Sequence, residues 1–286
     1  MGEVRTVGVV GAGQMGRGIA QVAAAAGYAV RLLDAAPGLA EAARASIDAA
    51  LERQVARGQL AEADRVRTVE AVQAVSAVSA LADADLVIEA VPEALALKLR
   101  VLAEIEAVLR DDAVLASNTS SLSITQLAAA CRLPQRVAGM HFMNPAPAMA
   151  LVELVVGAQT DEATASTVRA VAERMGKTVV AAQDSPGFVV NRLLIPFLNE
   201  ACFALQEGLA TPEELDAAVR VGLNHPMGPL ALADLIGLDT VLAIAEVLHG
   251  ELGDKYRPAG LLRRYVAAGW LGRKSGRGFF EYARRT

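Results

Sequence analysis

A glycine-rich hexapeptide near the start of the chain constrains its fold more than any other feature. It reads Gly11-Ala12-Gly13-Gln14-Met15-Gly16, the pattern G-x-G-x-x-G. The residues before it, 4–10, form a continuous apolar run rich in valine, and residues 14–26 have helical spacing that ends at Gly27. A buried strand, a glycine-rich turn and a helix in this order are the setting in which the motif binds a dinucleotide. The sequence therefore predicts a Rossmann-type sheet in this part of the chain.

The motif and the acid that follows it indicate which dinucleotide is bound. Gly11 permits the tight turn, Gly13 lets the backbone approach a pyrophosphate, and Gly16 lets helix and strand pack closely. The helix N-terminus offers unpaired N–H groups and a positive dipole to the phosphates. Asp34 ends the next predicted strand, residues 29–33, where a carboxylate accepts hydrogen bonds from a ribose diol and repels a 2′-phosphate. We therefore expect NAD as the cofactor, bound by Gly11, Ala12, Gly13, Gln14, Met15, Gly16 and Asp34.

The rest of the chain has two different patterns, which predict two domains. Further strands are expected at residues 85–91, 113–117, 136–142, 151–156 and 178–182, with a helix at 162–175 and a helical hairpin from 37 to about 72, broken near Gly58. After residue 185 the spacing becomes helical, at residues 188–207, 212–221, 229–248 and 261–268. We predict an α/β fold in which residues 1–185 form an NAD-binding, mostly parallel, doubly wound Rossmann sheet with an inserted helical hairpin, and residues 186–286 form an all-α C-terminal domain.

Charge, apolar content and cysteine usage narrow the class of protein. The net charge is −5 without a block of Lys and Arg residues, which argues against a nucleic-acid or membrane-surface partner. No apolar run has the length that spanning a bilayer requires. Cys131 and Cys202 lie far apart without metal-ligand spacing, so we expect free, buried thiols in a reducing compartment and no metal site. These observations predict a cytoplasmic protein.

His141 is the candidate catalytic base. It lies at the carboxyl end of a predicted strand, and ligands of open α/β sheets bind outside these strand ends. An imidazole is also the side chain best suited to take a hydroxyl proton near neutral pH. Glu153 lies inside the apolar run 151–156, where a carboxylate is costly unless it is paired. If a neighbouring strand brings Glu153 to His141, the pair has the arrangement of other His–carboxylate pairs. The alternative is a structural, buried His141.

Other polar residues have competing interpretations. The run 117–121, which includes Ser120, follows a predicted strand, where its hydroxyls either bind substrate or cap the helix that begins near Ser123. Asn191 lies early in the first C-terminal helix and either reaches across an interdomain cleft to the substrate or is a surface residue. His225 is a rival base, but its Pro- and Gly-rich surroundings favour a turn. His249 lies on a helix flank, which favours solvation or a C-terminal cap.

Several motifs in order give the chain a resemblance to a known family. The motifs are Ser117-Asn-Thr-Ser-Ser-Leu-Ser-Ile124, His141-Phe-Met-Asn-Pro-Ala-Pro147, Pro186-Gly-Phe-Val-Val-Asn-Arg192, His225-Pro-Met-Gly-Pro229 and Gly272-Arg-Lys-Ser-Gly276. With them, the chain resembles the short-chain L-3-hydroxyacyl-CoA dehydrogenases over essentially its whole length. Its likeness is greatest to the bacterial 3-hydroxybutyryl-CoA dehydrogenases.

The resemblance implies an activity and assigns roles to residues. It implies an NAD-dependent oxidoreductase acting on the C3 position of a short-chain 3-hydroxyacyl-CoA, with a C-terminal domain that binds substrate and forms a homodimer or higher homo-oligomer. Its catalytic pair falls on His141 and Glu153, and its substrate-binding residues fall on Ser120 and Asn191. Its cofactor contacts fall on Glu93, Lys98, Asn144 and Lys274, in addition to Asp34.

One departure and two alternative functions accompany this interpretation. The family often places a Ser and a Lys for CoA in the helical hairpin, where this chain has Ala50 and Arg57. The first alternative is a related hydroxyacid or sugar-acid dehydrogenase. Lysine-based members of that class would place a Lys near Asn191, where this chain has Arg192 instead. The second alternative is a non-catalytic NAD-binding protein like some lens crystallins, against which the complete set of His141, Glu153, Ser120 and Asn191 argues.

Overall fold

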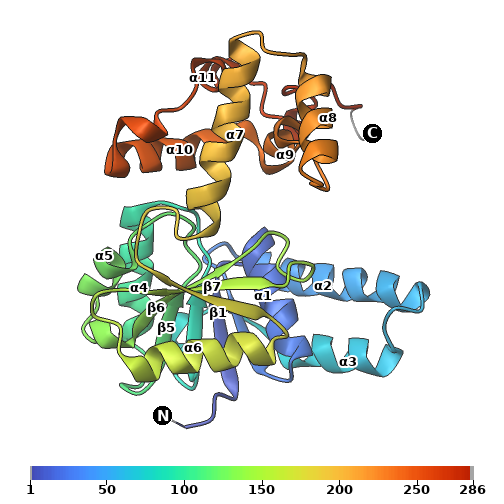
Figure 1. Ribbon diagram of the computed structural model, residues 1–286. Coiled ribbons are helices and arrows are strands. Elements are labelled where there is room, and N and C mark those ends of the chain that lie inside the picture. Colours follow the sequence, from blue (N-terminus) through green and yellow to red (C-terminus); the bar gives the residue numbers. More distant parts are fainter. Residues whose placement is uncertain (1, 284–286) are drawn as a thin grey trace. The chain divides into compact units, whose positions relative to one another are not determined.

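The computed structural model describes residues 2–283. The predicted domains 1–185 and 186–286 include Met1 and residues 284–286, respectively, and these four residues lie outside the described residues. The chain divides into two compact units, the first ending at Ser185 and the second beginning at Pro186 (Figure 1). Each unit has a hydrophobic core of its own.

The first unit is built around one eight-stranded sheet in the order β3-β2-β1-β4-β5-β6-β7-β8. Its strands are β1 (Thr6–Val10), β2 (Ala29–Leu33), β3 (Val72–Val75), β4 (Leu86–Glu89), β5 (Val114–Ser117), β6 (Val137–Phe142), β7 (Leu151–Val156) and β8 (Thr178–Gln183). All neighbours are parallel except β6 and β7, which pair antiparallel. The strand order reverses between β1 and β4, which confirms the predicted doubly wound, mostly parallel sheet.

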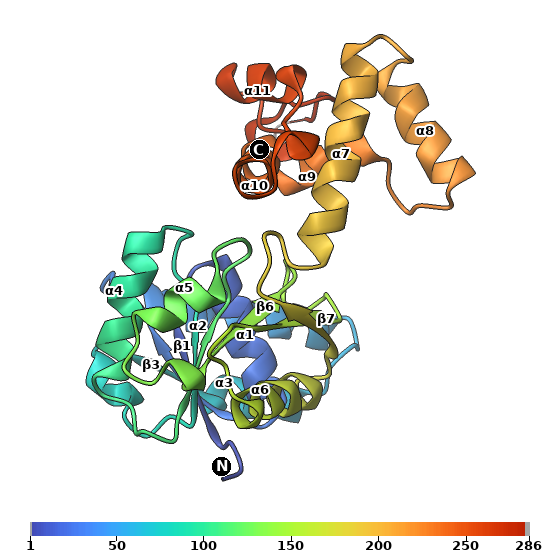
Figure 2. The same cartoon turned by 60° about the vertical axis from the view of Figure 1, so that its left-hand side comes forward.

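Helices cover both faces of this sheet. They are α1 (Gln14–Ala25), α2 (Leu39–Ala56), α3 (Glu62–Ala71), α4 (Leu95–Glu106), α5 (Ile124–Ala129) and α6 (Glu162–Arg174). Apolar residues of α1, α2 and α6 belong to one core layer on one face, and α4 and α5 lie on the other face (Figure 2). Helices α2 and α3 form the predicted hairpin, with the chain turning at Gly58, whose φ of +68° favours glycine.

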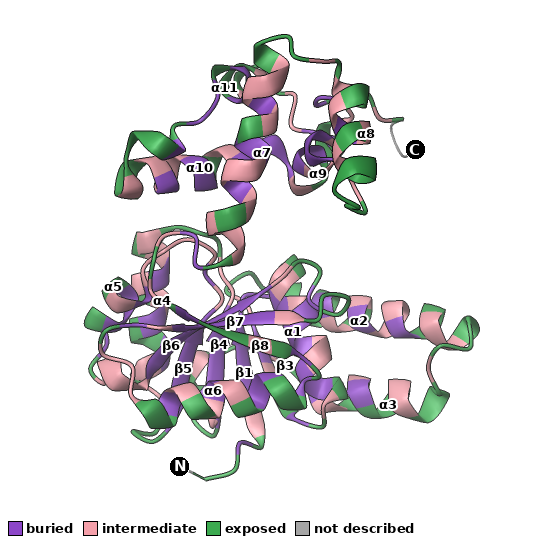
Figure 3. Cartoon of the chain, in the orientation of Figure 1, coloured by how far each residue is buried: buried purple, intermediate pink, exposed green. Residues whose placement is uncertain are grey.

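The burial of the central strands on both faces explains why their sequences are nearly continuous apolar runs. All residues of β4, β5 and β6 are buried, because helices pack on both sides of them (Figure 3). The edge strand β8 is mostly exposed or half-buried, and α3 buries only Thr68. Polar side chains placed in the central strands therefore lie in a dry environment, which is the setting of the candidate site.

The second unit consists of helices. They are α7 (Val190–Gln206), α8 (Pro212–Gly222), α9 (Pro229–Ile236), α10 (Leu238–Leu252) and α11 (Gly260–Ala267). Short 3-10 helices occur in both units, at Val78–Leu81, Pro134–Arg136, Asp254–Tyr256 and Arg273–Ser275. The prediction of one helix over residues 229–248 is wrong, because Gly237 has a φ of +103° and separates α9 from α10. Among the described residues, no helix combines the length and apolar character that crossing a membrane requires.

Both cysteines are buried free thiols, as the sequence predicts. Burial raises the pKa of Cys131 to about 11 and that of Cys202 to about 12. A thiol with so high a pKa carries almost no thiolate at neutral pH. Neither cysteine is therefore a candidate nucleophile.

The end of the described chain packs on the helices of the second unit. The carboxylate of Asp234, which is fully buried on α9, accepts hydrogen bonds from the backbone N–H groups of Phe279 and Phe280, both at 3.0 Å. It also accepts one from the hydroxyl of Tyr282, at 2.9 Å. The buried carboxylate of Asp234 thus holds residues 279–282 against α9.

We expect Asp234→Ala to destabilise the second unit by about 3 kcal/mol, because it leaves two backbone N–H groups without their acceptor. Denaturant unfolding followed by the fluorescence of Trp270, the one tryptophan of the chain, measures this change. Asp254→Ala is a suitable control, because its side chain is 88% exposed, and it should change stability by less than about 0.5 kcal/mol. Equal stabilities of the two variants would contradict the anchoring role of Asp234.

Candidate active site

The glycine-rich loop has the shape that a dinucleotide phosphate requires. Gly11 has a φ of +101°, and its N–H donates to the carbonyl of Leu33 at 2.8 Å. A Cβ atom on Gly16 would overlap the carbonyl oxygen of Gly11, so only glycine lets α1 approach the loop this closely. A Cβ on Gly13 would meet nothing within 4 Å. The backbone at Gly13, which is the N-cap of α1, is therefore open to a ligand.

Asp34 lies directly beside this loop. One carboxylate oxygen accepts the N–H of Ala12 at 2.7 Å, and the other accepts the N–H of Ala36 at 2.9 Å. The carboxylate is half-buried, and each oxygen has a second lone pair for a ribose hydroxyl. The first turn of α1 contains no acidic residue that would repel a phosphate. These residues fit a dinucleotide whose ribose carries a free 2′-hydroxyl.

We expect Asp34→Ala to weaken NADH binding and to reduce the discrimination against NADPH, because the carboxylate that repels a 2′-phosphate is lost. Titration of NADH and NADPH against the variant, followed by nicotinamide fluorescence, measures both affinities. Asp48→Ala on α2 is a control that leaves the loop unchanged. A cofactor preference that stays the same in Asp34→Ala would remove this residue from the role.

One residue of the glycine-rich motif, Gln14, contacts the predicted cofactor residue Asn144. The amide Nε2 of Gln14 donates to Oδ1 of Asn144 at 3.0 Å. Asn144 follows β6, and Gln14 is the first residue of α1. Met15 is half-buried against the core layer. The structure thus brings the motif and the end of β6 together, although they are far apart in the sequence.

His141 and Glu153 are direct cross-strand neighbours. They face each other in the antiparallel register of β6 and β7, and Nδ1 of His141 lies 2.7 Å from Oε2 of Glu153. Glu153 is fully buried and His141 is 7% exposed. An ionised carboxylate only accepts hydrogen bonds, so this contact places a proton on Nδ1 and leaves Nε2 as the acceptor. An imidazole held in this tautomer is suited to take a proton from a hydroxyl group.

The other two histidines lie in the second unit and have different surroundings. The His225 ring lies 5.5 Å from the ring of Phe197, on an exposed loop. Nε2 of His249 lies 3.0 Å from the exposed carboxylate of Asp254. Neither contact gives a histidine the buried acidic partner that His141 has.

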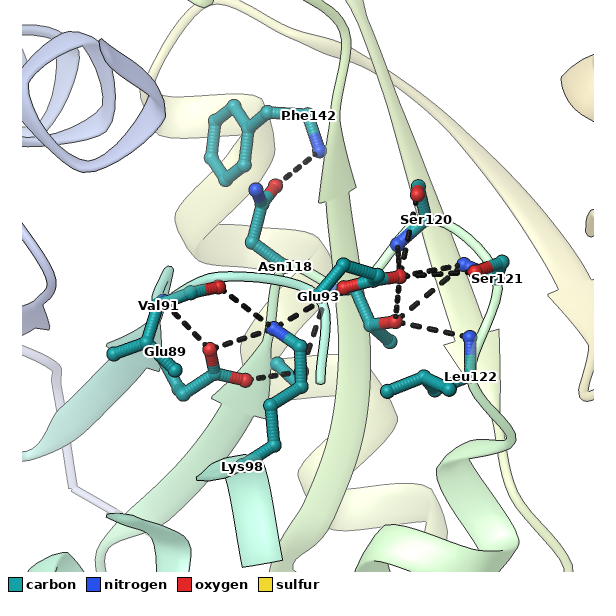
Figure 4. Close-up of polar contacts among 11 residues, drawn as sticks. Glu89, Val91, Glu93, Lys98, Asn118, Ser120, Ser121, Leu122 and Phe142 are labelled. Carbon is teal, nitrogen blue, oxygen red and sulfur yellow. Dashed lines mark hydrogen bonds and ion pairs between the residues drawn. The ribbon is translucent and has the colours of Figure 1, made fainter. Parts of the chain in front are cut away.

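The loop after β5 converges on a single carboxylate oxygen, Oε1 of Glu93 (Figure 4). It accepts the Thr119 hydroxyl at 2.6 Å, the Ser120 N–H and hydroxyl at 2.9 and 3.2 Å, and both donors of Ser121 at 3.1 Å. Burial by itself raises the pKa of Glu93, but the Lys98 ammonium and these hydrogen bonds outweigh it and hold the pKa below its usual range. Glu93 is therefore an anion that fixes the position of Ser120.

The same loop is tied to the strand that carries His141. The side-chain oxygen of Asn118 accepts the backbone N–H of Phe142 at 2.8 Å, and the backbone N–H of Asn118 donates to the carbonyl of Glu89 at 2.8 Å. The ends of β4, β5 and β6 are thereby joined side by side. Ser120, Glu93, His141 and Asn144 consequently lie at the same carboxyl edge of the sheet.

Lys98 lies at the end of β4, beside two carboxylates. It is only 1% exposed, and its ammonium lies 2.7 Å from Oε1 of Glu89 and 3.3 Å from Oε2 of Glu93. Sequence reasoning missed Glu89, although an acid at the end of the apolar run Leu86-Val87-Ile88 was a signal for it. It also missed the individual role of Asn118, for which the sequence carries no separate signal.

The remaining predicted residues lie in the second unit. Asn191 is in the first turn of α7, and Lys274 is in the 3-10 helix that follows Gly272. The ammonium of Lys274 lies 2.6 Å from Oδ2 of Asp239, on α10. The α5 helix does begin with Ser123 as its N-cap, with its hydroxyl accepting the N–H of Gln126. Helix capping therefore explains Ser123. The hydroxyl of Ser120 does not cap α5 but donates to Glu93.

Two family models cover nearly the whole chain. One, described as the NAD binding domain of 3-hydroxyacyl-CoA dehydrogenase, matches residues 6–185. The other, described as the C-terminal domain of 3-hydroxyacyl-CoA dehydrogenase, matches residues 187–282. The two matches meet where the two compact units meet.

Individual relatives are similar over their full lengths. A protein of Bacillus subtilis (strain 168), named probable 3-hydroxybutyryl-CoA dehydrogenase, is 50% identical over 285 residues, covering 99% of both chains. A 3-hydroxybutyryl-CoA dehydrogenase of Bradyrhizobium diazoefficiens is 49% identical, covering 98% of this chain and 96% of the relative. The crystal structure of (S)-3-hydroxybutyryl-CoA dehydrogenase from Ralstonia eutropha matches with a TM-score of 0.96 and 47% identity, covering 99% of this chain and 100% of that chain.

Proposed function

This chain belongs to the 3-hydroxyacyl-CoA dehydrogenase family, and we propose that it interconverts short-chain 3-hydroxyacyl-CoA and 3-oxoacyl-CoA thioesters, with 3-hydroxybutyryl-CoA as the preferred substrate. Family membership makes it an NAD-dependent oxidoreductase. The assignment of a short acyl chain rests on the names of the three relatives described above, which are named 3-hydroxybutyryl-CoA dehydrogenase or probable 3-hydroxybutyryl-CoA dehydrogenase.

The observation that carries the mechanism is the 2.7 Å contact between His141 and Glu153. Nε2 of His141 takes the proton of the substrate's 3-hydroxyl group and returns it when the reaction runs in reverse. Glu153 holds the imidazole in the required tautomer and stabilises the imidazolium that forms. Bound NAD supplies the hydride acceptor for oxidation, and in its reduced form the hydride donor for reduction. Ser120 and Asn191 orient the substrate oxygen.

The cofactor is assigned to the loop between β1 and α1. Residues 11–16 bind the pyrophosphate, and Asp34 binds the adenosine ribose. Glu93 and Asn144 lie at the ends of β4 and β6, on the other side of the strand-order reversal, where the nicotinamide half of a dinucleotide binds in such sheets. We further propose that Lys274 contacts the cofactor. We also propose that the second unit, from residue 186 onward, binds the substrate and forms the dimer. The proposed location is the cytoplasm, and the proposed context is short-chain fatty acid and butanoate metabolism.

A substrate panel tests this proposal. Acetoacetyl-CoA, longer 3-oxoacyl-CoA thioesters and free hydroxyacids or sugar acids are compared, the oxo compounds with NADH and NADPH and the hydroxy compounds with NAD. We expect the highest kcat/KM for acetoacetyl-CoA with NADH. A higher kcat/KM for a free acid would instead support a hydroxyacid or sugar-acid dehydrogenase. Binding of NADH without turnover of any compound would support a non-catalytic NAD-binding protein.

A further inference from the structure

A buried lysine outside the proposed mechanism contacts the loop that joins β6 to β7. Lys177 directly precedes β8 and is 8% exposed. Its ammonium donates to the carbonyl oxygens of Ala146 at 2.7 Å and of Met149 at 2.8 Å. Among the described residues, the lysines that pair with carboxylates are Lys98 and Lys274. The buried charge of Lys177 is therefore stabilised by the backbone dipoles of one loop.

Lys177 connects the end of α6 with this loop. Its backbone N–H donates to the carbonyl of Ala172, on α6, at 3.0 Å. Gly176 before it has a φ of +73°, which turns the chain from α6 into β8. Burial lowers the pKa of Lys177, because the charged form has lost contact with water. The two carbonyl groups replace much of this lost hydration, so the loop that carries them is held against α6.

Helix α1 holds the same loop from another side. A Cβ atom on Gly18 would lie 3.1 Å from Cδ of Pro147 and 3.2 Å from Cβ of Ala146, which is closer than ordinary van der Waals contact. Ala146 is only 2% exposed. Glycine weakens a helix interior relative to alanine, and the close approach of the loop is a reason for its presence here.

The loop between β6 and β7 carries Asn144, whose side-chain oxygen accepts the hydrogen bond from Gln14 at 3.0 Å. The loop is compact, because the backbone N–H of Ala148 donates to the carbonyl of Pro145 at 3.0 Å. A single residue separates Asn144 from Ala146, whose carbonyl Lys177 contacts. A shift of Ala146 therefore changes the position of the Asn144 side chain.

We propose that Lys177 and Gly18 are positioning residues for Asn144. They hold the loop between β6 and β7 so that the Asn144 side chain meets the nicotinamide half of the cofactor. Lys177 acts through the backbone of this loop, because its ammonium is bound to two of the loop's carbonyl groups. The inference rests on the proposed function, because it takes Asn144 as a cofactor residue.

The decisive comparison is the effect of Lys177→Met with and without Asn144. Methionine keeps an apolar stem of similar length and removes the charge with its hydrogen-bond donors. The change is introduced into the wild-type chain and into Asn144→Ala, and Lys255→Met, which alters an exposed lysine of the second unit, is the control. For each protein the dissociation constants of NADH and ADP are measured without acyl-CoA, and thermal unfolding is recorded. ADP has the adenosine and pyrophosphate of the cofactor but lacks its nicotinamide half.

We expect Lys177→Met to weaken NADH binding by about 3- to 10-fold in the wild-type chain, which is the effect of about one misplaced hydrogen bond. ADP affinity should change by less than about twofold, because the glycine-rich loop and Asp34 keep their contacts. In the Asn144→Ala background the same change should alter NADH affinity by less than about twofold, because the two residues act on one path. Lys255→Met should match the wild-type chain in both affinities.

Three results would overturn the proposal. An equal loss of NADH affinity in both backgrounds would mean that Lys177 acts independently of Asn144. An equal loss of NADH and ADP affinity would mean that the whole cofactor site is disturbed. A lower unfolding temperature at unchanged NADH affinity would leave Lys177 with a role in stability alone.

A second variant keeps the proposal testable if Lys177→Met does not fold. Gly18→Ala favours the helix but pushes the loop away from α1 by a few tenths of an ångström. We expect weaker NADH binding at unchanged ADP affinity, and unchanged NADH affinity in this variant would contradict the positioning of Asn144. A failure of the proposed function differs from these results, because the wild-type chain itself would then reduce no 3-oxoacyl-CoA, whereas both affinities are measured without acyl-CoA.

Discussion

Replacing His141 with alanine should lower kcat for acetoacetyl-CoA reduction by at least about a hundredfold, and by as much as about ten-thousandfold. His141 is the described histidine that pairs with a fully buried carboxylate at the carboxyl edge of the sheet. Its loss removes the group that exchanges the hydroxyl proton, and no other histidine of the first unit replaces it. NADH affinity should change by less than about threefold, because the glycine-rich loop and Asp34 keep their contacts.

His225→Ala is the matched control, because it removes the rival imidazole. The His225 ring packs near Phe197 on an exposed loop, so its loss should leave kcat close to that of the wild type. Steady-state kinetics with NADH and a separate NADH titration give both quantities for each variant. Near wild-type turnover in His141→Ala, or the larger loss in His225→Ala, would contradict the assignment of the base.

Replacing Glu153 with glutamine should give the second-largest effect, a decrease of kcat for 3-hydroxybutyryl-CoA oxidation by about a hundredfold or more. Glutamine has nearly the same shape but no charge, so the imidazolium that forms at His141 loses its stabilising partner. The glutamine amide can also donate a hydrogen bond to Nδ1, which selects the tautomer with its proton on Nε2. In that tautomer Nε2 cannot accept a proton from the substrate.

Comparison with Glu153→Asp separates charge from packing. Aspartate keeps the negative charge in the buried strand β7, so we expect it to restore part of kcat relative to glutamine, whereas a role in packing alone would favour the isosteric glutamine. Thermal unfolding of both variants shows whether the fold is intact. A glutamine variant that is faster than the aspartate variant would contradict an electrostatic role for Glu153.

Much of the fold could be predicted from local sequence signals. Apolar runs before Gly11 and before Ser117 mark strands buried on both faces, and Gly27 marks the end of α1. The contact between His141 and Glu153 could be anticipated because an acid inside an apolar strand needs a partner. The antiparallel register that makes the contact is a tertiary feature, which no local pattern encodes.

Other features depend on packing that the sequence pattern does not reveal. The short edge strand β3 continues directly from α3, and only its pairing with β2 distinguishes it from the helical hairpin. The prediction of a single helix over residues 229–248 is wrong because Gly237 adopts a positive φ, which separates α9 from α10. The helix α4, which lies outside the predicted elements, carries Lys98 to the buried Glu89. The family resemblance implies that Lys98 is functional, whereas its contact with Glu89 is visible only in the structure.

The central claim is that His141 and Glu153 act as one unit in proton transfer. The most direct test is the single-turnover rate of NADH oxidation by acetoacetyl-CoA in His141→Ala, Glu153→Gln and the double variant. The claim predicts that the double variant is as slow as His141→Ala to within about threefold, because a carboxylate without its imidazole has nothing left to orient. A double variant whose loss equals the product of the two separate losses would contradict it.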